Sequence, residues 1–382
     1  MLKINKEILA ENISKRIKND IDAQEICGAS VLVRQKGELL FKNCFGTTAP
    51  NGDVPLNYDT VFRMASMTKP VTAVATMILV EQGKLTLDDL VSDYLPIFKE
   101  QYVAKVENGE VVRDFKAKTP ITIRHLLTHT SGIGSGRVYD IQYEQMTPEA
   151  VATLDGAVSY YADMGLSFEP FTKEEYSGTA AFSVLTKIIE MQSGTDYETF
   201  LKENIFNPLG MTDTCFVPSD AQWTRMAVMF DKKDGKPCVG EHYENCVFRK
   251  FPCTHFLGGA GLISTLSDYD KFVQMLGNGG ILNGNRIISE QSVKEMATAH
   301  VPESIQGKDI RWGLGVRVIT GENVLPKGCF GWSGAFGTHF WVDPENQITA
   351  LYMKNACYDG GAGARTARNF ETDVYTSTEK EF

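Results

Sequence analysis

The stretch Phe62-Arg63-Met64-Ala65-Ser66-Met67-Thr68-Lys69-Pro70 runs directly into an apolar segment, Val71 to Val80. Pro70 would fall in the first turn of a helix, where its missing N–H costs little. Apolar residues then recur at steps of three and four: Val71, Val74, Ala75, Ile78 and Leu79. This spacing predicts a helix from Met67 to Gln82 that is buried on most sides, with Ser66 at its N-terminus.

Ser66 and Lys69 are three residues apart, so a helix would place them on one face with Cβ atoms about 5–6 Å apart. A hydroxyl beside an amine at the positive end of a buried helix suits nucleophilic catalysis. The alternative is an N-cap serine beside a solvated lysine. A second Ser-x-x-Lys, Ser377 to Lys380, lies in a polar tail with no apolar run after it, and we discount it.

The composition is that of an ordinary globular protein. The chain has 382 residues, 43% hydrophobic and 23% charged, with a net charge of −10. This charge argues against nucleic acid or an anionic membrane as partner. The N-terminus lacks an apolar signal core, and no segment approaches the ~20 apolar residues that span a bilayer, so we expect a cytoplasmic protein. The eight cysteines form no C-x-x-C pair and are expected to be free thiols.

Strand-like segments lie at both ends of the chain, with helical segments between them. Near the N-terminus, residues 5–24 predict a surface helix, followed by a hairpin of Cys27 to Arg34 and Glu38 to Phe45. Further helices are expected at Thr147 to Ala162, Ser177 to Ser193, Tyr197 to Phe206 and Ser267 to Leu276. Further strands are expected at Trp312 to Ile319, Gly331 to Val342 and Ile348 to Lys354. The order predicts an α/β (α+β) protein with one antiparallel sheet built from both ends of the chain.

Neither a metal site nor a nucleotide site is indicated. His125 and His129 are four residues apart, but no glutamate lies between them and no third ligand is evident, so capping or packing is the better interpretation. The glycine-rich segment from Gly258 to Ser264 lacks the spacing of a dinucleotide-binding loop. We therefore expect no cofactor.

The hydroxyl of Ser66 needs a base. No G-x-S-x-G elbow is present; Gly331-Trp332-Ser333-Gly334-Ala335 comes nearest but ends in alanine. The base must be Lys69 or a residue brought near it. Lysine and tyrosine both titrate near pH 10, so either requires a shifted pKa to act at neutral pH.

Three motifs, in this order, resemble those of the serine β-lactamase-like superfamily: Ser66-Met67-Thr68-Lys69, Tyr176-Ser177-Gly178 and Trp332-Ser333-Gly334. The resemblance, closest to class C β-lactamases, D-alanyl-D-alanine carboxypeptidases and family VIII esterases, runs from about Gly28 to Lys354. It implies one domain over residues 1–382. A sheet region would comprise about residues 1–62 and 300–382, and a mostly helical region about residues 63–299, with the active site between them.

The resemblance also implies roles. Ser66 would be the nucleophile, Lys69 would assist its deprotonation, and Tyr176 would be the general base and later the proton donor. The N–H groups of Ser66 and Ala335 would form the oxyanion hole. The substrate would contact Gly178, Trp332, Ser333 and Gly334.

Two positions depart from the lactam-cleaving pattern. Gly178 stands where that pattern has asparagine, and Trp332 where it has lysine, so an amide and a cation for an acylamido carboxylate are missing. Trp-x-Gly resembles the esterase branch. The expected function is a serine hydrolase on a small ester or amide, most simply a carboxylesterase for neutral esters. The alternatives are a β-lactamase or D-amino-acid peptidase, an acyltransferase, and a penicillin-binding sensor without turnover. The oligomeric state stays open.

Overall fold

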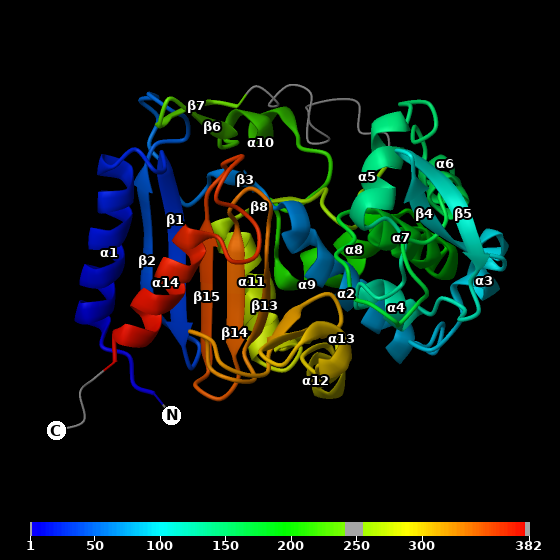
Figure 1. Ribbon diagram of the computed structural model, residues 1–382. Coiled ribbons are helices and arrows are strands. Elements are labelled where there is room, and N and C mark those ends of the chain that lie inside the picture. The colour runs from blue at the N-terminus through cyan, green and yellow to red at the C-terminus, as the bar shows by residue number, and fades with distance from the viewer. Residues whose placement is uncertain (1, 241–254, 379–382) are drawn as a thin grey trace.

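The computed structural model describes residues 2–240 and 255–378 and centres on a seven-stranded antiparallel sheet (Figure 1). In spatial order its strands are β11 (Ile310–Trp312), β12 (Arg317–Ile319), β13 (Phe330–Ser333), β14 (His339–Asp343), β15 (Ile348–Met353), β1 (Gly28–Gln35) and β2 (Glu38–Gly46). The N-terminal hairpin joins the C-terminal strands through β1 and β15, which pair from Ser30↔Met353 to Gln35↔Ile348. The predicted sheet, built from both ends of the chain, is confirmed.

Helices cover both faces of the sheet. On one face lie α1 (Lys6–Asp22) and α14 (Arg365–Thr376), and on the other lies α11 (Leu266–Gly277) (Figure 1). Successive strand residues point to opposite faces. Val31 and Trp341 accordingly pack with the α1 and α14 side, whereas Leu32 and Phe340 belong to the larger core toward the helical region.

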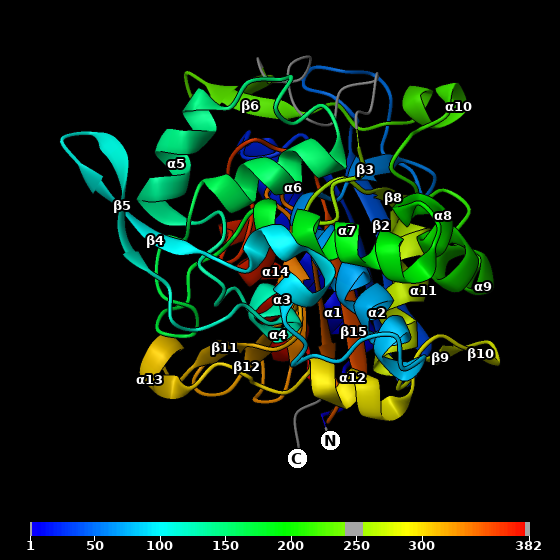
Figure 2. The same ribbon diagram turned by 90° about the vertical axis from the view of Figure 1, so that its right-hand side faces the viewer.

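In the sequence, the helical region lies between the N-terminal strands and the C-terminal strands of the central sheet. Its helices are α2 (Thr68–Glu81), α3 (Val91–Tyr94), α4 (Ile123–Leu127), α5 (Gly136–Gln145), α6 (Leu154–Asp163), α7 (Ala180–Ser193), α8 (Tyr197–Leu201), α9 (Asn207–Leu209), α10 (Asp220–Thr224), α12 (Glu290–Met296) and α13 (Glu303–Gln306). Short strands pair as β3 (Val61–Arg63) with β8 (Ile263–Thr265), β4 (Tyr102–Glu107) with β5 (Glu110–Lys116), β6 (Phe230–Lys233) with β7 (Lys236–Val239), and β9 (Ile281–Leu282) with β10 (Asn285–Arg286). Figure 2 shows α7 packed between α6 and α2, with the β4–β5 hairpin projecting from the molecule.

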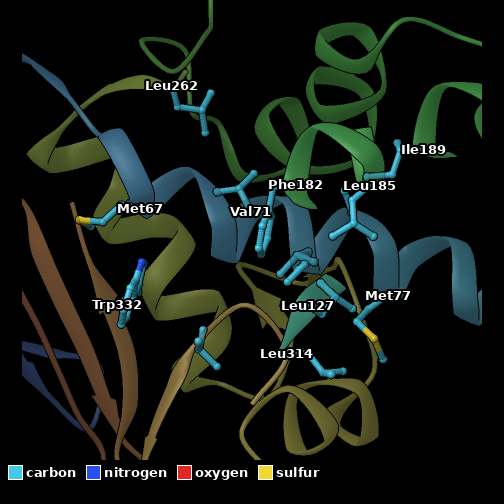
Figure 3. Close-up of a cluster of buried hydrophobic side chains, with 14 of the residues drawn as sticks. Met67, Val71, Met77, Leu127, Phe182, Leu185, Ile189, Leu262, Leu314 and Trp332 are labelled. Atoms are coloured by element: carbon cyan, nitrogen blue, oxygen red, sulfur yellow. The ribbon is translucent and has the colours of Figure 1, made fainter. Parts of the chain in front are cut away.

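Helix α2 is the buried axis of this region, as its sequence predicts. Every residue from Thr68 to Leu79 is buried. Val71 and Met77 of α2 lie among Phe182 and Leu185 of α7, and Trp332 of β13 lies near the first turn of α2 (Figure 3). Helix α2 therefore packs against the sheet at its first turn and against other helices of the helical region along its length.

Three sequence predictions of single elements are wrong. Gly331 to Val342 is a hairpin of two strands, because the chain turns between Ser333 and His339. Trp312 to Ile319 is likewise interrupted, at Gly315, whose φ of +67° breaks the extended backbone. The helix predicted from Thr147 begins only at Leu154, where Thr153 caps it by accepting a hydrogen bond from the N–H of Gly156.

Six cysteines lie within the described residues, and five of them, Cys27, Cys44, Cys215, Cys238 and Cys329, are free thiols, as expected. Cys246 and Cys253 lie outside the described residues. Across residues 2–240 and 255–378, no helix is long and apolar enough to cross a bilayer.

Candidate active site

Ser66 sits in a short 3₁₀ turn, Ala65–Met67, that leads from β3 into α2. Ala65 has a φ of +46°, in the left-handed region that non-glycine residues rarely adopt. Strain of this kind persists only where the surrounding structure holds it, and it is often found at functional sites. The turn leaves Ser66 partly exposed at the mouth of the buried helix, while Lys69 is fully buried.

The amine of Lys69 lies beneath Ser66 and is held by neutral groups. Its Nζ is 3.4 Å from the Ser66 Oγ, and it donates to the carbonyl oxygens of Gly178 at 2.5 Å and Gly259 at 2.8 Å. Burial lowers the pKa of Lys69 well below its ordinary value. The neutral amine, which can accept a proton, is thereby favoured.

Tyr176 lies above this amine, in the segment between α6 and α7. The Lys69 Nζ is 4.8 Å from the centre of the Tyr176 ring. Burial raises the pKa of Tyr176 to about 12, and the nearby Ser66 hydroxyl and Trp332 indole oppose that shift only in part. Its hydroxyl is buried, with no hydrogen-bond partner of good geometry in the described part of the chain.

A cage of rings surrounds Tyr176. Ring centres lie 5.4 Å away for Trp332, 6.0 Å for Trp312 and 4.5 Å for His129. The indole of Trp312 is fixed by donating to Glu174 Oε1 at 2.6 Å. His129 accepts from the N–H of Ser177 through Nδ1 at 3.1 Å, which holds the segment that carries Tyr176.

These residues border a cavity of about 350 Å³ at the junction of sheet and helical region. Its walls comprise Ser66, Glu174, Tyr176, Gln306, Ile310, Trp312, Arg317, Trp332, Ser333, Ala335, Gly361 and Ala362. Five residues predicted from sequence therefore line one cavity: Ser66, Tyr176, Trp332, Ser333 and Ala335. Lys69 and Gly178 join them through the hydrogen bond beneath Ser66.

Gly334 has a packing reason to be glycine. A Cβ there would lie 2.2 Å from the Thr338 Oγ1 and 2.3 Å from the Met64 carbonyl oxygen. The close approach brings the end of β13 against the turn that carries Ser66. At Gly178, by contrast, a Cβ would meet nothing within 4 Å, so a side chain has room there.

Sequence reasoning did not find Glu174, Trp312 and Arg317 as site residues. Trp312 and Arg317 belong to β11 and β12, whereas Glu174 lies in the segment before α7. The sequence gives no local signal for them, because their approach depends on how the helical region packs against the sheet.

The two histidines have structural roles, as the sequence suggested. His125 completes a capping box with Thr122 at the start of α4, and His129 packs among the rings around Tyr176. Within the described residues, no three His, Cys, Asp or Glu side chains are grouped so as to hold a metal ion. Ser377 is buried at the end of α14, where its Oγ donates to the Asp373 carbonyl oxygen and accepts from Asn12; Lys380 lies outside the described residues.

Comparison with known proteins supplies the family. Residues 13–372 match the family described as Beta-lactamase. The chain belongs to the beta-lactamase family. This confirms the resemblance inferred from the three motifs.

Three relatives illustrate the range of this beta-lactamase family. Protein Rv1367c of Mycobacterium tuberculosis is 32% identical over 92% of this chain and 91% of its own length. Esterase EstB of Burkholderia gladioli is 27% identical over 90% and 89%. Monacolin J acid methylbutanoyltransferase of Aspergillus terreus is 25% identical over 94% of both chains.

A solved structure shares the fold. EstCE1, described as a hydrolase with promiscuous acyltransferase activity, superposes with a TM-score of 0.80 at 24% identity and covers 97% of this chain and 99% of its own. The predicted β-lactamase-like architecture is confirmed.

Proposed function

We propose that this protein is a serine hydrolase that works through an acyl-enzyme, and that it is a carboxylesterase for small neutral esters. The observation that carries the proposal is the pairing of the Ser66 Oγ with the Lys69 Nζ at 3.4 Å, under a cavity that Tyr176 also lines. A nucleophile within reach of an amine whose pKa is lowered, at the floor of a cavity, is the arrangement expected for covalent catalysis.

The opposite pKa shifts of Lys69 and Tyr176 support the following order for the first proton transfers. Lys69 takes the proton of Ser66 while Oγ attacks the ester carbonyl, and the N–H groups of Ser66 and Ala335 stabilise the oxyanion. Tyr176, protonated at rest, gives its proton to the departing alcohol. This order differs from the role of general base that the family resemblance implies for Tyr176.

Hydrolysis of the acyl-enzyme reverses these transfers. Water attacks the acyl carbonyl and gives a proton to the Tyr176 phenolate. The Lys69 ammonium returns its proton to the Ser66 Oγ as the acid departs, so both groups regain their resting states.

The aromatic walls of the cavity support a neutral substrate, and the two charged residues that also line it, Glu174 and Arg317, are of opposite sign. Trp312, Tyr176 and Trp332 present aromatic surface, and Trp332 stands where the lactam-cleaving pattern has a lysine. Gly178 supplies no side-chain amide. Each missing hydrogen bond to a charged group is worth about 1.5–3 kcal/mol, which disfavours the alternative of a β-lactamase or D-amino-acid peptidase.

Acyl transfer to an alcohol other than water is the second candidate. It uses the same residues, and it is supported by the 25% identity to the Aspergillus terreus methylbutanoyltransferase over 94% of the chain. The two reactions differ only in which hydroxyl attacks the acyl-enzyme. A sensor that is acylated and never released is disfavoured, because Tyr176 and Lys69 remain in place for the second step.

The proposal is tested by turnover of p-nitrophenyl esters of graded chain length, with a chromogenic cephalosporin alongside and Ser66→Ala as the control. Faster hydrolysis of a short ester supports the carboxylesterase. An added alcohol that yields a new ester in place of the free acid would identify the acyltransferase. A preference for the cephalosporin would contradict the proposal.

A further inference from the structure

A chain of buried hydrogen bonds ends at the cavity wall. Ser333 on β13 lies opposite His339 on β14, and the Ser333 Oγ is 2.8 Å from the His339 Nδ1. The His339 Nε2 is 3.0 Å from the Glu371 Oε1 on α14. Ser333 and His339 are each 2% exposed and Glu371 is 4% exposed, so water does not compete for these contacts.

The carboxylate at the far end fixes the direction of these hydrogen bonds. Burial alone would raise the pKa of Glu371, but the hydrogen bond from His339 and the charges of Arg317 and Arg368 lower it overall. An ionised carboxylate only accepts, so the His339 Nε2 carries the hydrogen. In the neutral imidazole Nδ1 then accepts, and the Ser333 hydroxyl donates to it. Ser333 is left with oxygen lone pairs to offer to a ligand.

Arg317 lies beside Ser333 and supplies hydrogen-bond donors. Arg317 pairs with Gly331, two residues before Ser333, so it is a diagonal neighbour within reach of a long side chain. Both Arg317 and Ser333 line the cavity. The Arg317 Nη2 is 3.8 Å from the Glu371 Oε1, so Glu371 offsets its charge, while a guanidinium has further N–H groups that can donate to a ligand.

We propose that Ser333 and Arg317 form a subsite for a neutral group that both donates and accepts a hydrogen bond, such as a hydroxyl or a carboxamide on the substrate. His339 and Glu371 are the positioning residues: they hold the Ser333 hydroxyl hydrogen on the His339 Nδ1, so that Ser333 accepts hydrogen bonds from the ligand. A substrate carboxylate is disfavoured, because it would face the lone pairs of Ser333 and the charge of Glu371 behind them. This inference rests on the proposed function and names the substrate class more closely.

Ser333, His339 and Glu371 also have the spacing of a nucleophile, a base and an orienting carboxylate. Two facts favour a binding role over acylation of Ser333. Ser333 is almost entirely enclosed, whereas Ser66 is partly exposed at the cavity floor. Ser66 also stands at the start of a helix, next to a buried amine.

Matched esters test the subsite. The p-nitrophenyl esters of 3-hydroxybutyrate and isovalerate differ by a hydroxyl in place of a methyl group, and the hemisuccinate adds a carboxylate. We expect the wild-type kcat/KM to favour 3-hydroxybutyrate over isovalerate by about fivefold to tenfold, the size of one net hydrogen bond. The hemisuccinate should be the slowest of the three. A wild type that prefers the hemisuccinate would overturn the inference and leave Arg317 as a site for carboxylates.

Variants of Ser333 and Glu371 distinguish a role in orienting the hydrogen bonds of the subsite from a role in protein stability alone. Ser333→Ala should abolish the preference for 3-hydroxybutyrate. In Glu371→Gln the side-chain amide can donate to the His339 Nε2. The His339 Nδ1–H would then donate to Ser333, and the Ser333 hydroxyl would be free to donate to the ligand. The rate for hemisuccinate should therefore rise relative to that for 3-hydroxybutyrate. The matched control is Asp373→Asn on the same helix, where the buried Asp373 pairs with Arg16 of α1 and does not line the cavity; its ester ratios should equal those of the wild type. Equal ratios in Glu371→Gln and wild type would contradict the positioning role.

The histidine tautomer gives a readout that does not depend on turnover. In ¹⁵N-histidine NMR spectra near pH 8, with His339→Asn used for assignment, we expect the Nε2–H tautomer at His339. The Nδ1–H tautomer, or an acyl group found on Ser333, would overturn the inference even in an active esterase. Absence of all ester turnover in a protein with the Nε2–H tautomer would instead contradict the proposed function, and with it the substrate preference.

Discussion

The Nζ of Lys69 lies 4.8 Å from the centre of the Tyr176 ring, and burial shifts the pKa values of these two residues in opposite directions. Lysine moves toward its neutral amine and tyrosine stays protonated. Groups whose surroundings separate their pKa values in this way can divide the roles of base and acid between them. Ser66 lies within reach of both.

The pH dependence of turnover should report Lys69. The group must be neutral to accept the Ser66 proton, so kcat/KM should be high above the pKa of Lys69 and fall as the pH drops through it. Because burial lowers that pKa, activity should persist well below pH 10.5, the ordinary value. A pH–rate profile of kcat/KM measures it in the free enzyme.

Lys69→Arg tests the same assignment. Arginine keeps a cation but does not deprotonate, so we expect kcat/KM to fall by ~10²–10⁴-fold. Lys187→Arg is a control, because Lys187 on α7 pairs with Asp155 outside the cavity. Full activity in Lys69→Arg would show that Lys69 is not the base.

Tyr176→Phe should remove most turnover and leave stability nearly unchanged. The ring keeps its contacts with Trp312 and Trp332, and the lost hydroxyl has no hydrogen-bond partner of good geometry among the described residues. We expect kcat to fall by ~10²–10⁴-fold with Tm unchanged, measured beside Tyr160→Phe, whose hydroxyl donates to the Gln142 carbonyl oxygen away from the cavity. Normal kcat in Tyr176→Phe would leave Tyr176 as a wall of the cavity only.

The preference between esters and lactams should change when Gly178 and Trp332 are replaced by the residues of the lactam-cleaving pattern. Gly178→Asn has room, since a Cβ there meets nothing within 4 Å, whereas Trp332→Lys gives up ring contacts with Tyr176 and Trp312. The double variant should raise kcat/KM for a chromogenic cephalosporin relative to p-nitrophenyl butyrate by about tenfold or more. An unchanged ratio would mean that these positions do not set specificity.

Local sequence pattern predicted the parts of the fold whose signals are local. The spacing of Val71 to Leu79 fits a buried helix, and the segments flanking Gly37 fit a hairpin. Helix α14 was not predicted, because its buried face carries Glu371 and Asp373, which are paired with His339 and Arg16 and read as surface charges in sequence. Nothing in the local pattern could show those partners, which are distant in sequence.

The same distinction holds for the site. Ser66, Lys69, Tyr176 and Trp332 could be predicted as candidate site residues because their motifs occur together in a known order. Arg317, His339 and Glu371 come from two strands and a helix and meet only through packing of the sheet against α14. The turn between β13 and β14 was also missed, since the contact that forces Gly334 against Met64 is made across the molecule.

The central claim is that Ser66 is the residue that carries the acyl group, and covalent labelling tests it most directly. The protein is treated with a fluorophosphonate, digested and sequenced by mass spectrometry, with Ser66→Ala treated in parallel. We predict one label, on Ser66, and none in the variant. A label on Ser333 or Ser377, or an unlabelled Ser66 in protein that still hydrolyses esters, would contradict the account.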